Sequence, residues 1–259
     1  MPPVSIIIPA WNEEKRLART LDLYLPFLEA QHPDYETIVV ADGVADRTVE
    51  VADRYSSRGV RVLRFPTKLG KGGAILEGLA ASRFPIVGFI DADCTIPGSE
   101  LMELISAAVR FPCVVGRRIG HGRPYGDSGA GRSLERALLG GLWRAVVRAL
   151  FFLPVTDPQC GAKFFQRESI RPILQQVEVT DWAFDVSLLY HIWRAGITIH
   201  EVPVSWIHLE GSKLSAARVS VAMFMSAVGM RMVNSPLKPA IPPGLIDRLR
   251  LLMAEHPSR

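Results

Sequence analysis

Short runs of β-branched residues alternate with longer segments of helical spacing over the first 117 residues, and this alternation constrains the fold more than any other feature. Buried strands are predicted at Val4–Pro9, Thr37–Ala41, Val60–Phe65, Ile86–Ile90 and Val114–Gly116. Helices are predicted between them at Glu13–Ala30, Asp46–Ser57, Gly72–Ser82 and Ser99–Arg110. Because repeated strand–helix–strand units bury their apolar faces in a sheet flanked by helices, we expect an α/β fold with a mostly parallel sheet.

The pattern changes after Arg117, where a glycine-rich loop is expected. The predicted elements that follow are a helix at Ser133–Phe152, a helix at Asp181–Ala195, a strand at Thr198–Pro203 and two helices within Leu214–Met253. Prolines separate the last two helices. We therefore expect one α/β domain over residues 1–211 and a C-terminal helical appendage over residues 212–259.

Positive charge is concentrated in the middle of the chain. The whole sequence has a net charge of +4, but the segment from Arg110 to Arg171 holds 11 Lys and Arg against 4 Asp and Glu. This excess is typical of a protein that binds nucleic acid, a phosphorylated ligand or an anionic membrane, although a basic solvated face has the same composition. Arg136, Arg144 and Arg148 share one face of a predicted helix, which fits either a membrane-surface helix or a helix packed against the sheet.

Cysteine content and hydropathy indicate the cellular compartment in which the protein is expected. Three cysteines without a CxxC pair favour a reducing compartment over a disulfide framework or a cysteine zinc site. The beginning of the chain lacks the basic and apolar regions of a signal peptide. The longest uncharged apolar stretch, Val219–Met230, has 12 residues, whereas a spanning helix needs about 18. We therefore expect a chain that does not cross a membrane by itself.

Carboxylates and lysines gather at the predicted carboxyl ends of the strands, the edge at which ligands bind in such sheets. Asp91 and Asp93 directly follow the strand Ile86–Ile90. Two carboxylates one residue apart suit a hard cation such as Mg²⁺ that also holds substrate phosphates, although they could instead cap the next helix. Lys68 and Lys71 lie in a glycine-rich turn before a helix, where amides and an ammonium group suit a phosphate. The turn lacks GxxxxGK[ST], and no GxGxxG follows the first strand, so P-loop and dinucleotide enzymes are disfavoured.

Taken together, these stretches resemble family 2 glycosyltransferases, inverting enzymes with the Rossmann-like GT-A fold. The matching segments of the first half are Val4–Glu14, Ile38–Gly43, Gly70–Ile75 and Asp91–Asp93. Four further segments resemble polyprenyl-phosphate glycosyltransferases, especially dolichyl-phosphate glucosyltransferases: Asp157–Phe165, Trp182–Tyr190, Glu201–Val204 and Glu210–Leu214. The resemblance spans about residues 4–235, with the motifs in the same order.

The resemblance implies a donor site and a metal site at the strand ends. Asp91 and Asp93 would bind Mg²⁺ or Mn²⁺ and the diphosphate of a nucleotide sugar, which makes Asp93 a catalytic residue. The other donor-binding residues that the resemblance implies are Pro9, Trp11, Glu13, Asp42, Lys71 and Ala92. Trp11 replaces the usual Tyr, so base stacking is expected without a phenol hydrogen bond. Thr95 replaces a metal-binding Gln of some relatives and would be a weaker ligand.

The resemblance also implies a site for an acceptor phosphate. The matching residues are Arg117, Arg118, Arg132, Ser133, Arg136 and Lys213. Arginine suits this task because its planar guanidinium can donate two parallel hydrogen bonds to phosphate oxygens. Mannosyl-type relatives carry an Arg where this chain has Ile207, which favours the glucosyl-type group.

Asp185 and Asp157 are candidate catalytic residues with several possible roles. Asp185 stands where relatives that glycosylate hydroxyl groups keep their general base. A phosphate with a second pKa of about 6 is already a nucleophile at neutral pH, so strong base catalysis is unnecessary for it. Both carboxylates would then orient a substrate or the acceptor loop, or act only as helix caps and ion-pair partners. Gln159 and Cys160 are expected to be structural, and no histidine shows metal spacing.

These interpretations lead to one expected function and two alternatives. We expect metal-dependent inverting transfer of a hexose to a polyprenyl (dolichyl or undecaprenyl) phosphate by a peripheral protein on the cytoplasmic face of a membrane. UDP-glucose is the favoured donor and GDP-mannose the next, and no nucleic-acid partner is expected. The alternatives are a family 2 enzyme that uses Asp185 as base on a soluble acceptor, and a non-catalytic protein that binds nucleotide or membrane.

Overall fold

A computed structural model describes residues 2–32, 34–93, 96–119, 134–177, 183–205, 216–235, 242 and 244–248, without the side chains of 134–140, 142 and 216–223. Its centre is a seven-stranded sheet with the order β3-β2-β1-β4-β6-β5-β7. The strands are β1 (Val4–Ala10), β2 (Tyr35–Asp42), β3 (Val60–Phe65), β4 (Ile86–Ile90), β5 (Cys113–Ile119), β6 (Ala162–Gln166) and β7 (Ile199–Ser205). All are mutually parallel except β6, which runs antiparallel to its neighbours β4 and β5. The expected mostly parallel sheet is confirmed.

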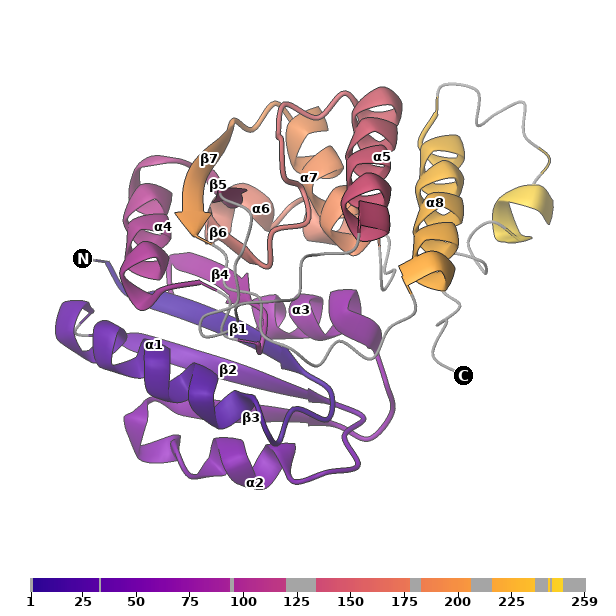
Figure 1. The fold of residues 1–259 in the computed structure, drawn as a ribbon. Coiled ribbons are helices and arrows are strands. Elements are labelled where there is room, and N and C mark those ends of the chain that lie inside the picture. Colours follow the sequence, from indigo (N-terminus) through magenta and orange to yellow (C-terminus); the bar gives the residue numbers. More distant parts are fainter. Residues whose placement is uncertain are drawn as a thin grey trace.

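Helices cover both faces of this sheet (Figure 1). One face carries α1 (Leu17–Gln31), α2 (Thr48–Asp53) and α4 (Gly98–Arg110), and the other carries α3 (Gly70–Ala81) and α7 (Phe184–Arg194). Beyond α7, α5 (Leu134–Phe151) and α8 (Ala216–Val233) pack side by side. The remaining elements are the short helix α6 (Arg167–Ile170) and the 3₁₀ turns η1 (Ser56–Arg58) and η2 (Leu174–Gln176).

The core lies on both faces of the four central strands. Ile6, Ile7 and Ile8 of β1 are each no more than 1% exposed, because helices shield the two faces to which successive side chains point. Each such side chain contributes about 1.5–3 kcal/mol relative to an exposed one. This rigid centre fixes the carboxyl ends of β1, β2 and β4 beside one another.

Several elements differ from the expectations. Helix α1 begins at Leu17 rather than Glu13, because the Glu13 carbonyl first closes a turn by accepting the amide of Arg16. Helix α2 ends at Asp53 and is followed by η1. Strand β6 was not expected at all, since Lys163, its second residue, interrupts the apolar run that marks a buried strand.

The C-terminal part contains helix at two places, as the sequence predicts: α8 and residues 244–248. On α8, Met230 is fully buried, whereas Phe224 and Met225 are about half exposed, at 46% and 48%. None of the helices in the described ranges combines the length and hydropathy needed to span a membrane.

Candidate active site at the carboxyl ends of the strands

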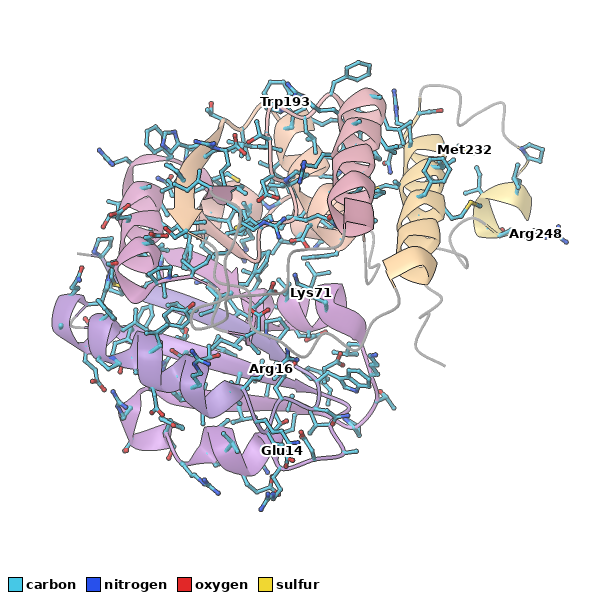
Figure 2. The ribbon with its side chains drawn as sticks, in the orientation of Figure 1. Glu14, Arg16, Lys71, Trp193, Met232 and Arg248 are labelled. Carbon is cyan, nitrogen blue, oxygen red and sulfur yellow. The ribbon has the colours of Figure 1, made fainter. Side chains whose placement is uncertain are left out.

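Polar side chains collect where β1, β2 and β4 end. Trp11 follows β1, Asp42 is the last residue of β2, and Asp91 and Asp93 follow β4. Because β1 pairs with both β2 and β4, these residues occupy adjoining positions along one edge of the sheet. Figure 2 shows Lys71 at the start of α3, between the sheet and the layer formed by α5 and α7.

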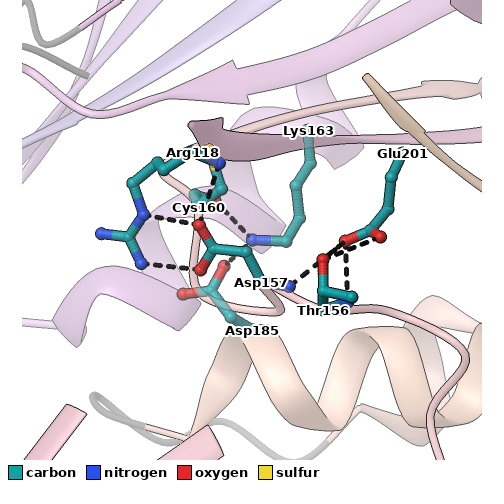
Figure 3. A network of polar contacts seen from close by, with 7 residues as sticks. All are labelled: Arg118, Thr156, Asp157, Cys160, Lys163, Asp185 and Glu201. Atoms are coloured by element: carbon teal, nitrogen blue, oxygen red, sulfur yellow. Dashed lines mark hydrogen bonds and ion pairs between the residues drawn. The ribbon is translucent and has the colours of Figure 1, made fainter. Parts of the chain in front are cut away.

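A chain of alternating charges starts at this edge and runs into the interior. The Lys71 ammonium lies 2.9 Å from Oδ1 of Asp91 and 3.4 Å from Oδ2 of Asp185 in the first turn of α7. The other carboxylate oxygen of Asp185 accepts a 2.6 Å hydrogen bond from Lys163 of β6 (Figure 3). Lys163 also donates to the Cys160 carbonyl at 2.7 Å. The structure therefore connects Asp91 to a fully buried lysine through two intervening charged groups.

These contacts set the protonation states of the chain. Burial by itself raises the pKa of the Asp185 carboxyl, but Lys163 and Lys71 more than offset this effect, so its pKa lies below the usual value. Burial lowers the pKa of Lys71, but Asp185 and Asp91 outweigh it and the net pKa is raised. Asp185 is therefore a fixed anion and Lys71 a fixed cation at neutral pH.

Two glycines allow the close approaches that this arrangement needs. A Cβ on Gly72 would lie 2.6 Å from the Phe184 ring, so its absence lets α3 pack tightly on α7 and brings Lys71 near Asp185. A Cβ on Gly161 would lie 2.0 Å from Oδ2 of Asp91. The Gly161 carbonyl also accepts the Asp91 amide at 3.0 Å, which holds the segment before β6 directly against the carboxylate.

A second ion pair lies at the end of β5 (Figure 3). The Arg118 guanidinium donates to both carboxylate oxygens of Asp157, at 2.6 and 2.7 Å, and the Arg118 amide donates to the same group. Burial raises the pKa of Asp157, but Arg118 more than offsets this, and the pKa lies below the usual value. Glu201 of β7 fixes the loop by accepting hydrogen bonds from Thr156 and from the Asp157 amide. Asp157 thus orients Arg118 rather than standing alone.

The residues after β1 form the rim of the site. The Trp11 indole is 47% exposed, and the Lys68 ammonium lies 3.7 Å from the centroid of its ring. Glu13 accepts two hydrogen bonds from the Arg16 guanidinium. Burial raises the pKa of Glu13, and Arg16 only partly offsets it. The negative charge of Asp91 also raises the pKa of Glu13, so the two carboxylates lie within electrostatic reach of each other.

Asp42 caps helix α3. It is 3% exposed, and its two carboxylate oxygens accept the amides of Leu69 and Gly70 at 2.5 and 3.0 Å. Leu69 precedes α3 and Gly70 begins it, so these amides lie at the helix start, where the sequence analysis expected a phosphate. The anion that neutralises this helix start is therefore a side chain of β2, and a nucleoside-binding role of Asp42 stays a prediction.

The other expected residues have varied surroundings. Pro9 is half-buried within β1, and Arg117 is half-buried in β5, where it pairs with Pro203 of β7. The Ala92 carbonyl accepts the Thr20 hydroxyl of α1 at 2.7 Å, which fixes the turn between Asp91 and Asp93. Four implied positions, Thr95, Arg132, Ser133 and Lys213, lie outside the described residues, and Arg136 is described only as backbone in α5.

The carboxylates after β4 fit a divalent cation that is shared with a substrate. Asp91 and Asp93 supply hard oxygen ligands one residue apart. Among the described side chains, no third His, Cys, Asp or Glu joins them in a metal-binding group. Mg²⁺ is commonly held by one or two carboxylates plus substrate phosphates, so this donor set suits a cation bound together with a diphosphate.

Sequence reasoning missed the role of two residues within segments that it had singled out. Lys163 and Glu201 lie in motifs of the second half, but neither was assigned a function. A lysine within an otherwise apolar run was the available signal, because lysine is almost never fully buried unless it is paired. Cys160 agrees with its structural assignment: burial raises the pKa of its thiol to about 11, so it is an inert thiol at neutral pH.

Comparison with known proteins gives a consistent picture. Residues 5–174 match glycosyl transferase family 2. The dolichyl-phosphate beta-glucosyltransferases of Drosophila melanogaster and Homo sapiens are each 36% identical to this chain, over 228 and 224 residues, and each alignment covers 82% of this chain and 69% of the relative. A glucosyl-3-phosphoglycerate synthase of Mycobacterium tuberculosis, crystallised with Mn²⁺, UDP-glucose and phosphoglyceric acid, superimposes with a TM-score of 0.62 at 19% identity, covering 93% of this chain and 81% of the synthase.

Proposed function

This chain belongs to glycosyl transferase family 2 and is a glycosyltransferase with the GT-A fold, and from this premise we propose that it transfers glucose from UDP-glucose to a polyprenyl phosphate. The reaction forms a bond between a phosphate oxygen of the lipid and the anomeric carbon, and it breaks the bond from that carbon to the nucleoside diphosphate. Inversion converts an α-linked donor into a β-linked lipid-phosphate sugar.

The state of Asp185 is the observation that carries this proposal. Both of its carboxylate oxygens contact lysine ammonium groups, and its pKa is lowered, so it is a poor general base at neutral pH. A hydroxyl acceptor needs such a base, whereas a phosphate monoester with a second pKa of about 6 is already an anionic nucleophile. The pairing of Asp185 therefore favours a phosphate acceptor over a soluble alcohol or sugar.

On the donor side, Asp91 and Asp93 would hold Mg²⁺ or Mn²⁺, whose charge when bound neutralises the negative charge that grows on the departing diphosphate. Lys71 adds a fixed positive charge 2.9 Å from Asp91. The Trp11 side chain, which is about half exposed, offers an aromatic ring on which the base can stack. The synthase crystallised with Mn²⁺ and UDP-glucose supports this choice of donor and cation.

On the acceptor side, Arg118 is the described arginine that is best placed for a lipid phosphate. Asp157 holds its guanidinium in one orientation at the end of β5, so positioning contributes to catalysis without proton transfer. Arg117, Arg132, Ser133, Arg136 and Lys213 complete the proposed acceptor site. The two dolichyl-phosphate beta-glucosyltransferases support this acceptor class.

The lipid tail requires contact with a membrane surface. Helix α5 presents exposed Arg144 and Arg148, and the adjoining Phe152 is 72% exposed. Exposed Phe224 and Met225 lie on α8, the neighbour of α5. Basic and large apolar side chains on adjacent helices suit an interface with anionic lipid. We assign this surface to peripheral binding on the cytoplasmic face of a membrane.

The acceptor class is tested by comparing two lipids that differ in one group. The protein is incubated with UDP-glucose, Mn²⁺ and either a short polyprenyl phosphate or the corresponding polyprenol. Glucosylation of the phosphate alone is expected. Transfer to the alcohol, or to a soluble sugar in place of either lipid, would contradict the phosphate acceptor and favour the enzyme that uses Asp185 as base.

A further inference from the structure

We propose that Lys163 is a positioning residue of the donor site: acting through Asp185, it holds the Lys71 ammonium beside Asp91, where the diphosphate of the donor binds. This inference rests on the proposed function in one respect, namely that the ligand at Lys71 is a nucleoside diphosphate. It concerns a residue of β6 that lies behind the carboxylates and does not itself reach the substrate.

The charge of Lys163 is buried within the sheet and is fully paired there. The side chain of Lys163, the second residue of β6, is fully buried, and the strand register places it opposite Phe89 of β4 and Val115 of β5. Its ammonium lies 5.3 Å from the centroid of the Phe89 ring. A buried ammonium is costly unless it is paired and hydrogen-bonded. Here its partners are the Cys160 carbonyl and Oδ1 of Asp185.

The contacts of Asp185 connect this buried charge to the edge of the sheet. Asp185 divides its two oxygens between Lys163 at 2.6 Å and Lys71 at 3.4 Å, so the shorter contact is the one to the buried lysine. Lys71 in turn lies closer to Asp91, at 2.9 Å. Lys163 neutralises the charge of Asp185 from the interior of the sheet. Asp185 therefore attracts the Lys71 ammonium less strongly, and this ammonium stays close to Asp91.

Removal of Lys163 would change that balance. Two ammonium groups and two carboxylates make the chain from Asp91 to Lys163 neutral. Without Lys163, the remaining negative charge of Asp185 has Lys71 as its nearest cation, and it would draw that ammonium inward, away from Asp91. Removal of Lys163 would therefore weaken the binding of a ligand that contacts Lys71, although Lys163 itself does not contact that ligand.

The test uses Lys163→Met, which removes the charge and keeps an unbranched apolar chain. Calorimetric titration with UDP and Mn²⁺ is expected to show an affinity about tenfold weaker, the loss of roughly one charge-assisted hydrogen bond. The KM for UDP-glucose should rise to a similar extent, while the KM for the lipid phosphate stays unchanged. A protein that is merely less stable, with unchanged UDP affinity, would overturn the proposal.

Arg61→Met is the matched control. It breaks the 2.8 Å ion pair with the buried Glu36, which lies near the amino end of β2, the opposite end of that strand from Asp42. This variant should lower the melting temperature and leave the affinity for UDP unchanged. Equal effects of Arg61→Met and Lys163→Met on UDP binding would identify a general loss of stability and overturn the proposal.

A double variant keeps the test decisive if Lys163→Met does not fold. Lys163→Met/Asp185→Asn removes both buried charges, and its UDP affinity is expected to equal that of Asp185→Asn alone. A UDP affinity of the double variant clearly below that of Asp185→Asn would show that Lys163 does not act through Asp185. If the wild-type protein transfers no sugar to lipid phosphate but the variants bind UDP more weakly, the role of Lys163 is supported and the proposed function is contradicted. If the wild-type protein is active on lipid phosphate but the variants bind UDP normally, the proposed function is supported and the role of Lys163 is contradicted.

Discussion

Gly161→Ala tests whether the position of Asp91 governs the reaction. The new Cβ would lie 2.0 Å from Oδ2 and 2.5 Å from Cγ of Asp91, whereas ordinary contacts begin at 3.4 Å. Gly161 does not have a positive φ, so alanine introduces no backbone strain of that kind. Because the Asp91 side chain is 34% exposed, it can rotate away from the new methyl group and lose its 2.9 Å contact with Lys71.

Gly161→Ala is expected to reduce kcat/KM strongly and the free energy of unfolding only slightly. Relief of the contact from 2.0 Å to the ordinary 3.4 Å requires the carboxylate to move by more than 1 Å, and a misplacement of about 1 Å can already cost about 100-fold in rate. This loss in kcat/KM corresponds to about 2.7 kcal/mol of transition-state stabilisation. The Lys71–Asp91 pair is partly exposed, so its loss should lower the free energy of unfolding by no more than about 1 kcal/mol.

The assay combines steady-state kinetics of glucosyl transfer with urea denaturation. Gly78→Ala is the control, because its Cβ would lie 2.4 Å from Cγ2 of Ile7, a core side chain. That variant should be destabilised by about 1–3 kcal/mol through overpacking, with kcat/KM unchanged. The reasoning would be refuted if Gly161→Ala kept wild-type kcat/KM, or if both variants lost activity in proportion to stability.

Three other substitutions have expected outcomes. Asp93→Ala should make UDP affinity independent of Mn²⁺ in a calorimetric titration with and without EDTA, and a retained Mn²⁺ effect would remove Asp93 from the metal site. Arg136→Ala should sharply reduce transfer to lipid phosphate while UDP binding is nearly intact; equal losses would count against an acceptor role. Asp157→Asn should lower the free energy of unfolding by about 2 kcal/mol at pH 7, because Arg118 loses charge-assisted hydrogen bonds. The pKa of Asp157 is lowered in the folded state. The difference in unfolding free energy between wild type and variant should therefore be complete above the ordinary aspartate pKa and should disappear as the pH falls through the lowered folded-state pKa. A difference that stays constant in acid would contradict this assignment.

Local sequence patterns were sufficient to predict most of the sheet and the placement of candidate residues at the ends of its strands. The β-branched runs and helical spacing depend on neighbouring residues, so β1, β3 and β4 were found with bounds that differ by at most one residue. Strand β6 was missed because its burial depends on a partner elsewhere in the chain. Lys163 is compatible with a buried strand only because Asp185, 22 residues away, neutralises it.

The connections among the site residues could not be predicted from the sequence for the same reason. Asp91, Asp157 and Asp185 were each candidates, but the chain order does not indicate which cation each one contacts. Lys71 and Asp185 are separated by 114 residues and meet only because Gly72 allows α3 to approach α7. Such pairings depend on tertiary packing, which also places a lysine ammonium group on each carboxylate oxygen of Asp185.

Mass spectrometry of the lipid fraction directly detects transfer of glucose to a lipid phosphate. The protein is incubated with Mn²⁺, a short polyprenyl phosphate and a mixture of UDP-glucose, GDP-mannose and UDP-N-acetylglucosamine. The lipid phosphate is expected to gain one hexose, and UDP-glucose alone should reproduce the gain. An unchanged lipid, with the donors either intact or consumed, would contradict the proposed function.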